Sequence, residues 1–197
     1  IVALLGTGSA FYAPAASGEA LKLAGFDAVG NANNVNYGAA AIRASVSRLR
    51  QLGIPNTGAG ANRAAAYAPV IVERNGARVG FLQRTSVYWP TNHEAGEHSP
   101  GVAVIRGNTA YQVPAHKTRP EIPPMNRPGL PPIILTWAER EHLQRFQDDI
   151  AALRKRADIV VCSNHWGLHQ EVLDYMTEIA HAAIDAGADV VIGHGPH

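Results

Sequence analysis

The chain has 197 residues, of which 46% are hydrophobic and 17% charged, and its formal net charge is +1. This is the composition of a globular domain with a sizeable core, and it excludes the strongly basic footprint of a nucleic-acid-binding protein. The single cysteine, Cys162, excludes an internal disulfide framework and a cysteine-rich zinc site. Because Cys162 lies in an apolar run, we expect it to be a small core residue.

The first predicted element is a strand over residues 1–5 (IVALL). Neither a basic leader nor a long apolar segment precedes it in this stretch, so the sequence indicates no signal peptide or membrane span there. The chain also stops at His197, directly after a predicted strand and its loop. We therefore expect a fragment of a longer fold.

The next elements alternate between helix and strand. A short helix is expected over residues 17–24, closed by Gly25, and a strand over residues 26–29 runs into the polar segment 31–34 (NANN). A longer helix follows and ends at Gly53. Its apolar positions recur at helical spacing: Ile42, Val46, Leu49 and Leu52. Residues 70–73 and 78–82 predict an antiparallel hairpin around Asn75-Gly76.

Periodicity disappears between residues 84 and 135, where nine of the thirteen prolines fall between Pro90 and Pro132. We interpret this segment as a Pro-rich insertion within a single domain that spans residues 1–197. It carries several aromatic residues and histidines, which favours an ordered lid or substrate-binding loop. An irregular surface excursion with ordinary packing aromatics is the alternative.

Regular structure resumes at residues 136–139, where Thr136 and Glu139 match a capping box. The helix expected there buries one stripe: Leu143, Phe146, Ile150 and Leu153. A strand over residues 159–162, a helix over about 171–186 and a strand over residues 188–192 complete the chain. The second of these helices is expected to bury Leu173, Met176, Ile179, Ala183 and Ile184 and to end at Gly187. This alternation predicts parallel strands with crossover helices, and hence an α/β fold.

Two histidine clusters follow the last two predicted strands: residues 164–167 (NHWG) and residues 193–197 (GHGPH). The carboxyl ends of parallel strands meet at one edge of a sheet, so His165, His194 and His197 should converge there. Imidazoles in this position are typical metal ligands. Polar strand-end residues that bind the backbone are the alternative.

Several segments, in order, together resemble the bacterial CapA family, which is named for capsule and poly-γ-glutamate synthesis. They are residues 25–34, 58–62, 69–76, 165–167 and 187–197. The family is similar to the calcineurin-like metallophosphoesterases. The resemblance implies a β-sandwich of two mixed sheets flanked by helices, incomplete at both ends here. It also implies two divalent metal ions (Mn, Fe or Zn), a location at the cell envelope or outside the cell, with the cytoplasm left open, and a membrane-associated capsule synthesis complex.

Carried over by position, the resemblance implies that Asn34, His165, His194 and His197 ligate metal. The chain departs from the family pattern in three places. Val35 stands where the family has its histidine acid, Asn36 stands where it has an aspartate, and the Gly-Asp motif of the family is not found. Glu171 lies near a family glutamate but two positions away from the expected offset. Without the resemblance, Asn33 and Asn34 would be read as a simple turn.

This donor set suits Zn, Mn or Fe(II), and two such ions would activate a water for attack on a phosphoryl group. We assign catalytic roles to His165 and His169, with His93 or His98 as alternative acids in place of His169. Asn33, Trp166 and His93 are the predicted substrate contacts. Two functions follow. One is a metal-dependent hydrolase of a phosphoester or related anionic bond, on a small molecule or a polymer. The other is a non-catalytic envelope protein that binds or exports an anionic polymer such as poly-γ-glutamate.

Overall fold

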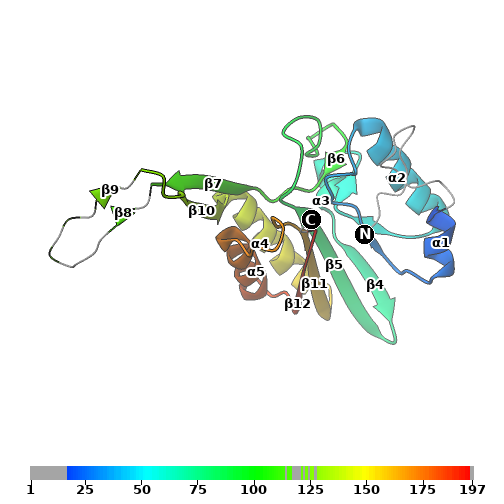
Figure 1. Cartoon of the computed structure of the whole chain (residues 1–197). Helices are drawn as coiled ribbons and strands as arrows, with labels where there is room; N and C mark the ends of the chain where they lie inside the picture. The colour runs from blue at the N-terminus through cyan, green and yellow to red at the C-terminus, as the bar shows by residue number, and fades with distance from the viewer. Residues whose placement is uncertain are drawn as a thin grey trace.

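The computed structural model describes residues 17–113, 115–116, 121, 123, 125–126 and 128–195. The strand predicted at residues 1–5 and the predicted ligand His197 lie outside this part of the chain. Within it, helices and strands are arranged around one four-stranded sheet (Figure 1). The α/β class expected from the sequence is therefore confirmed.

The four-stranded sheet is mixed and runs in the order β12 (Val190–His194), β11 (Ile159–His165), β5 (Ala77–Thr85) and β4 (Val70–Arg74). Strands β5, β11 and β12 are parallel, whereas β4 pairs antiparallel with β5. Asn75 and Gly76 form the β4–β5 turn with φ values of 50° and 81°, which confirms the predicted hairpin. The parallel strands bring their carboxyl ends to one edge of the sheet.

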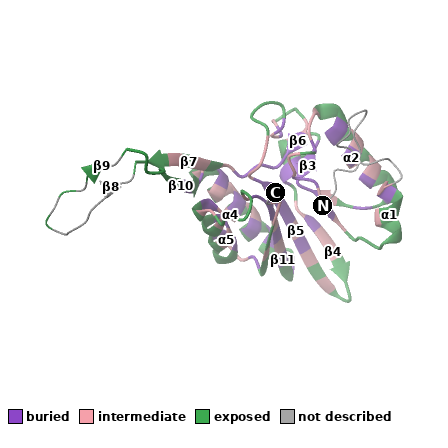
Figure 2. Cartoon of the chain, viewed as in Figure 1, coloured by how far each residue is buried: buried purple, intermediate pink, exposed green. Residues whose placement is uncertain are grey.

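Helices α4 (Arg140–Arg154) and α5 (Asp174–Asp185) pack on this sheet and enclose the main core (Figures 1 and 2). The buried stripe of α4 is confirmed, because Phe146, Ile150 and Leu153 lie in this core. Cys162 of β11 lies there too, and burial raises the pKa of its thiol to about 12, as expected of an inert core cysteine. The predicted burial of Ile184 is wrong, since this side chain is 49% exposed on α5.

The N-terminal part holds three helices and three short strands. They are α1 (Ser17–Leu23), β1 (Val29–Gly30), α2 (Ala39–Leu52), β2 (Asn56–Thr57), β3 (Ala59–Gly60) and α3 (Arg63–Tyr67). Strand β1 pairs parallel with β2, and β3 pairs antiparallel with β6 (Gly101–Val102). Gly53 ends α2 with φ 73°, which confirms the predicted left-handed C-cap.

The strand predicted over residues 26–29 is only partly present, because Phe26 belongs to the end of α1. The Gly25 N–H donates to the Lys22 carbonyl at 3.1 Å, and the Phe26 N–H donates to the Leu21 carbonyl at 3.2 Å. These two bonds form a Schellman motif, in which the backbone of Phe26 is used to close the helix. Only Val29 and Gly30 are left to pair with β2.

The segment from residue 84 to residue 135 divides into two parts. Residues 102–105 are buried in the body of the molecule. Beyond them, β7 (Gly107–Gln112) and β10 (Ile133–Ala138) form an antiparallel ribbon that projects from the body, with β8 (Ala115–His116) and β9 (Met125–Asn126) further out (Figure 1). We call β7, β10 and the chain between them the arm. That residues 84–135 are one insertion within a single domain stays a prediction.

The predicted capping box at residues 136–139 is wrong. Strand β10 continues to Ala138, and α4 begins at Arg140 without a side-chain cap. The Thr136 hydroxyl instead accepts a hydrogen bond from the Tyr175 N–H at 3.2 Å, and the Ala138 N–H donates to Glu178 at 2.6 Å. Contacts with α5 therefore hold residues 136–138 in the extended conformation.

The β1–β2 pair lies across a cleft from the face of the four-stranded sheet that carries Phe81 and Gln83. This second β layer agrees with the expected sandwich architecture. In the described part of the chain, no helix has both the length and the apolar character needed to cross a membrane.

Candidate functional site

His165 and His194 are direct neighbours at the ends of two parallel strands. They are register partners in the β11–β12 ladder, and their ring centroids are 5.4 Å apart with the planes tilted by 53°. The prediction that both lie at one sheet edge is therefore confirmed. We call them the histidine pair.

The protonation of His165 follows from its contact with Thr85. The His165 Nδ1 lies 3.0 Å from the Thr85 hydroxyl, whose single proton is donated to the Val87 carbonyl at 2.7 Å. Nδ1 must therefore be the donor in the Thr85 contact, which leaves the lone pair of His165 on Nε2. The ring is 1% exposed and lies against Gly195, where a Cβ would come within 2.5 Å of it.

The ring of His194 is half-buried and held by two polar side chains. Its Nε2 lies 3.2 Å from the Gln83 Nε2 and 3.1 Å from the Ser163 hydroxyl. Desolvation by burial lowers the pKa of His194 to about 4, so the ring is neutral at pH 7. A neutral imidazole can serve as a ligand or as a hydrogen-bond donor.

Residues 33–36 form a turn, as the simpler interpretation of this segment predicts. The Asn33 Oδ1 accepts from the Val35 N–H at 2.9 Å, and the Asn36 N–H donates to the Asn33 carbonyl at 3.2 Å. The Asn34 Oδ1 is nevertheless buried with no hydrogen-bond partner among the described residues. Val35, in the place of the family histidine, is exposed.

His93 braces this turn from the loop that follows β5. Its Nδ1 accepts from the Trp89 N–H at 3.0 Å, and its Nε2 donates to the Asn36 carbonyl at 3.0 Å. Burial lowers the pKa of His93, which keeps the ring neutral. Both ring nitrogens are used by the backbone, so the geometry favours a supporting role for His93 over the predicted substrate contact.

The remaining predicted site residues lie in varied surroundings. Trp166 is buried in the main core, where its indole lies against Gly193, and this geometry favours packing. His169 is exposed on the turn after β11 with φ 51°, and His98 is exposed beside Glu97. Across the described ranges, no three or more His, Cys, Asp or Glu side chains form a group that could hold a metal ion. The predicted metal role of the histidine pair and Asn34 stays a prediction.

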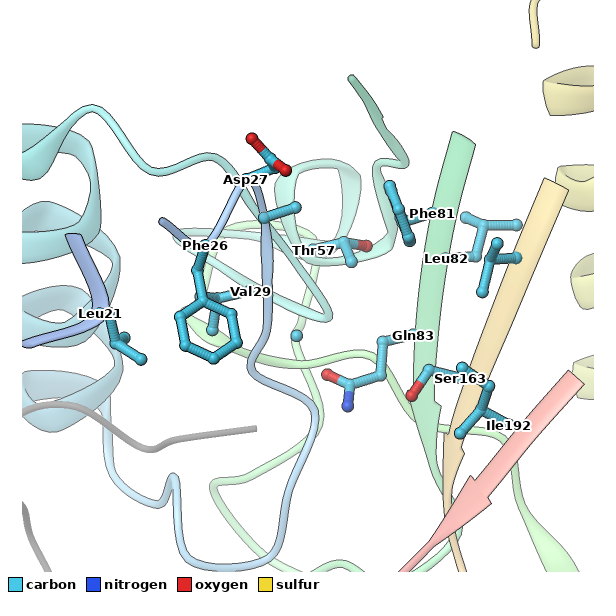
Figure 3. A pocket seen from close by; sticks show the side chains of 13 residues that line it. Leu21, Phe26, Asp27, Val29, Thr57, Phe81, Leu82, Gln83, Ser163 and Ile192 are labelled. Carbon is cyan, nitrogen blue, oxygen red and sulfur yellow. The ribbon is translucent and has the colours of Figure 1, made fainter. Parts of the chain in front are cut away.

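A cleft of about 360 Å³ lies beside Gln83 and Ser163 (Figure 3). Its walls are mainly apolar, with Phe26 and Val29 on one side and Phe81 and Ile192 on the other. Gln83 and Ser163, which both contact His194, line it as well. The sequence analysis missed Gln83, Ser163 and Thr85. The signal that could have found them is the change from apolar to polar residues at the carboxyl ends of β5 and β11.

Comparisons with known proteins agree on one family. The sequence profile of "Bacterial capsule synthesis protein PGA_cap" matches residues 5–197. The chain is 27% identical to the capsule biosynthesis protein CapA of Bacillus anthracis, over 91% of this chain and 36% of that protein. It is also 27% identical to the uncharacterized protein y4sH of Sinorhizobium fredii, over 91% of this chain and 46% of that protein. A shorter match, 44% identical over 50 residues, is to the PGA biosynthesis protein CapA of Bacillus subtilis, over 24% of this chain and 13% of that protein. The chain thus spans less than half the length of these relatives.

Proposed function

The chain belongs to the PGA_cap family of bacterial capsule synthesis proteins, and from this membership we propose that it acts in the synthesis or export of an anionic envelope polymer such as poly-γ-glutamate. The names of the relatives support this role, since two of them are called capsule or PGA biosynthesis proteins. Work at the cell envelope, beside a membrane-associated synthesis complex, is part of the proposal.

The histidine pair is the functional centre in this proposal. His194 binds an anionic oxygen of the polymer or of a phosphoester, because the N–H of His165 is already donated to Thr85. The observation that carries this assignment is the placement of His165 and His194 in register at the strand ends, 5.4 Å apart, with His194 in contact with Gln83 and Ser163 of the cleft. The groups that hold the two rings are neutral: Thr85, Ser163 and Gln83. The N–H of a neutral imidazole such as His194 suits a carboxylate or phosphate oxygen.

A two-metal centre does not fit the described residues. The predicted ligands that the structure describes are the two imidazoles and the Oδ1 of Asn34, which is buried without a hydrogen-bond partner. Divalent ions in pairs are held by more ligands than this and usually by carboxylates. No described cluster of His, Cys, Asp or Glu supplies them. We therefore derive no reaction step through metal.

Metal-dependent hydrolysis of a phosphoester is a second proposal. It is favoured by the resemblance to the metallophosphoesterases and by the Asn34 Oδ1, which is buried without a partner, as a ligand oxygen would be. In this proposal His165 offers the lone pair of Nε2, and His169 is the candidate acid. Val35 argues against it, because this residue replaces the family acid.

One experiment separates the two proposals in the full-length protein. Binding of poly-γ-glutamate would be measured by calorimetry in the presence of EDTA, and Mn, Fe and Zn would be measured by elemental analysis. His194→Ala is the test variant, and His181→Ala, on the exposed side of α5, is the matched control. Binding that survives EDTA and falls at least about tenfold only in His194→Ala supports the first proposal.

The other outcomes are equally distinct. Bound metal that is lost in His194→Ala, together with chelator-sensitive phosphoester hydrolysis, would support the hydrolase. A protein that neither binds the polymer nor holds metal at this site would overturn both proposals.

A further inference from the structure

Gln83 occupies a slot whose walls are backbone. Its side chain is 1% exposed and projects from β5, so that the carboxamide lies between Val29 of β1 and Ser163 of β11 (Figure 3). A Cβ at Gly30 would come within 2.3 Å of the Gln83 Oε1, and a Cβ at Gly58 within 2.9 Å. Only glycine at these two positions leaves room for the carboxamide.

The orientation of this carboxamide is fixed by its contact with Ala32. The Ala32 backbone N–H can only donate, and it lies 2.7 Å from the Gln83 Oε1. The other end of the carboxamide, the NH₂ group, must therefore point at the His194 Nε2, 3.2 Å away. An NH₂ group can only donate, so the His194 Nε2 must accept.

The tautomer of His194 follows from this chain of donors. With the lone pair on Nε2, the single hydrogen of the neutral ring lies on Nδ1. The Ser163 hydroxyl, 3.1 Å from the same Nε2, can donate to it as well. His194 therefore has the same tautomer as His165, whose Nδ1 donates to Thr85 and whose lone pair is on Nε2.

We propose that Gln83 is a positioning residue that sets His194 as an Nδ1–H donor and ties it to Ala32, which directly precedes the turn formed by residues 33–36. A ligand of His194 is then a hydrogen-bond acceptor, such as a carboxylate or phosphate oxygen. This second step rests on the proposed function, because it requires that a ligand binds at the histidine pair. The tautomer of His194 does not depend on the proposed function.

The tautomer can be measured by ¹⁵N NMR of the full-length protein labelled at histidine, at pH 7. Loss of one resonance pair in His194→Gln assigns the ring. The wild-type protein is expected to show a pyridine-type Nε2 and a pyrrole-type Nδ1. In Gln83→Glu, both side-chain oxygens can only accept, so the hydrogen should move onto Nε2. Gln83→Met, which donates nothing, should give a mixture of tautomers.

A matched control is Gln112→Glu, which makes the same change on the exposed strand β7 and should leave the His194 resonances unchanged. A wild-type ring that carries hydrogen on Nε2 would overturn the proposal, and this result needs no variant that folds. So would a Gln83→Glu protein with the wild-type tautomer.

Anion binding at His194 is measured separately from the tautomer. Inorganic phosphate and glutarate are titrated into the labelled wild-type protein, and the Nδ1–H signal of His194 should shift, with binding about tenfold weaker in Gln83→Met. The expected tautomer with no shift for either anion would keep the role of Gln83 and overturn anion binding at this site. A wrong tautomer would overturn the role of Gln83 even if the anions bind.

Discussion

Arg84 of β5 and Asp149 of α4 form an ion pair on the α4 side of the sheet, next to Gln83 in the strand, with 2.6 Å between the Arg84 Nη2 and the Asp149 Oδ2. The Arg84 side chain is 1% exposed, and its guanidinium lies 4.6 Å from the centre of the Tyr67 ring and 5.6 Å from that of Phe146. The pair thus fixes the end of β5, whose Gln83 carries the contact with His194. Loss of this ion pair should lower the stability of the protein and disturb the candidate site.

Asp149→Ala should destabilise the protein by about 3 kcal/mol, because it leaves the buried charge of Arg84 without its counterion. The measurement is urea unfolding at pH 7. Asp148→Ala is the matched control: its carboxylate is exposed and accepts from Gln144, so its loss should cost less than about 0.5 kcal/mol. If the two variants lost the same free energy of unfolding, the Arg84–Asp149 pair would stabilise the protein no more than the exposed carboxylate of Asp148 does.

Gly193 is required because the Trp166 indole lies against its backbone. A Cβ at this position would be 2.4 Å from the Trp166 Nε1, and the indole is packed in the core and cannot move aside cheaply. Gly193→Ala should therefore cost about 1–3 kcal/mol of unfolding free energy. Gly107→Ala, where the nearest atom is in the Tyr175 ring at 3.1 Å, should cost clearly less. The prediction fails if Gly193→Ala unfolds at the same urea concentration as Gly107→Ala.

The elements that the sequence predicts well are those that depend on local spacing. Helices α2 and α4 bury a stripe at helical intervals, and such a stripe is readable whatever lies opposite it. The same holds for the turn at Asn75-Gly76, since these residues adopt positive φ in any surroundings. The His165–His194 neighbourhood could also be predicted, because the order of parallel strands and crossover helices brings both strand ends to one edge.

The features that were missed depend on contacts between distant residues. Thr136 and Glu139 match the sequence pattern of a capping box, but the hydroxyl of Thr136 accepts from the backbone of Tyr175, which is 39 residues further along the chain. Gln83 binds Ala32, which is 51 residues earlier, and His194, which is 111 residues later. No local pattern marks these pairs. A site assembled in this way becomes visible only when the chain is folded.

The outer part of the arm, residues 111–134, should be dispensable for folding of the body. Tyr111 is 71% exposed, and Ile133 and Ile134 are about half exposed, so the outer ribbon adds little to any core. Residues 111–134 can be replaced by Asn-Gly between the register partners Ala110 and Leu135, which preserves the contacts of residues 136–138 with α5. We expect a change of about 1 kcal/mol or less by urea unfolding.

The control for the arm is a change in the core. Leu153→Ala, which removes a fully buried side chain of α4, should cost about 3 kcal/mol in the same assay. If the shortened protein lost its cooperative transition, the arm would be part of the folding unit, contrary to this prediction.

Acid should weaken the fold through the buried ring of His93. Burial lowers the pKa of His93 in the folded protein, whereas the unfolded chain takes up this proton near the ordinary value of about 6.5. Below about pH 6.5 the unfolded state therefore binds more protons than the folded state, and stability falls as the pH falls until the folded pKa is passed. Above this window neither state is protonated at His93, and its contribution no longer changes with pH.

The free energy of unfolding in urea, measured from pH 7.5 down to pH 5, tests this sign. One group contributes at most about 1.4 kcal/mol per pH unit. His93→Gln should make the curve less steep between pH 6.5 and pH 5, because one of the titrating rings is gone. His194, whose pKa is about 4, should keep its own contribution to the slope. The loss of His93 also lowers stability at pH 7.5. His181→Gln, at an exposed position on α5, should keep the wild-type slope. If the His93→Gln curve were as steep as that of the wild type, His93 would not account for the loss of stability in acid. The half-buried His194, whose pKa is about 4, would then be the next ring to replace.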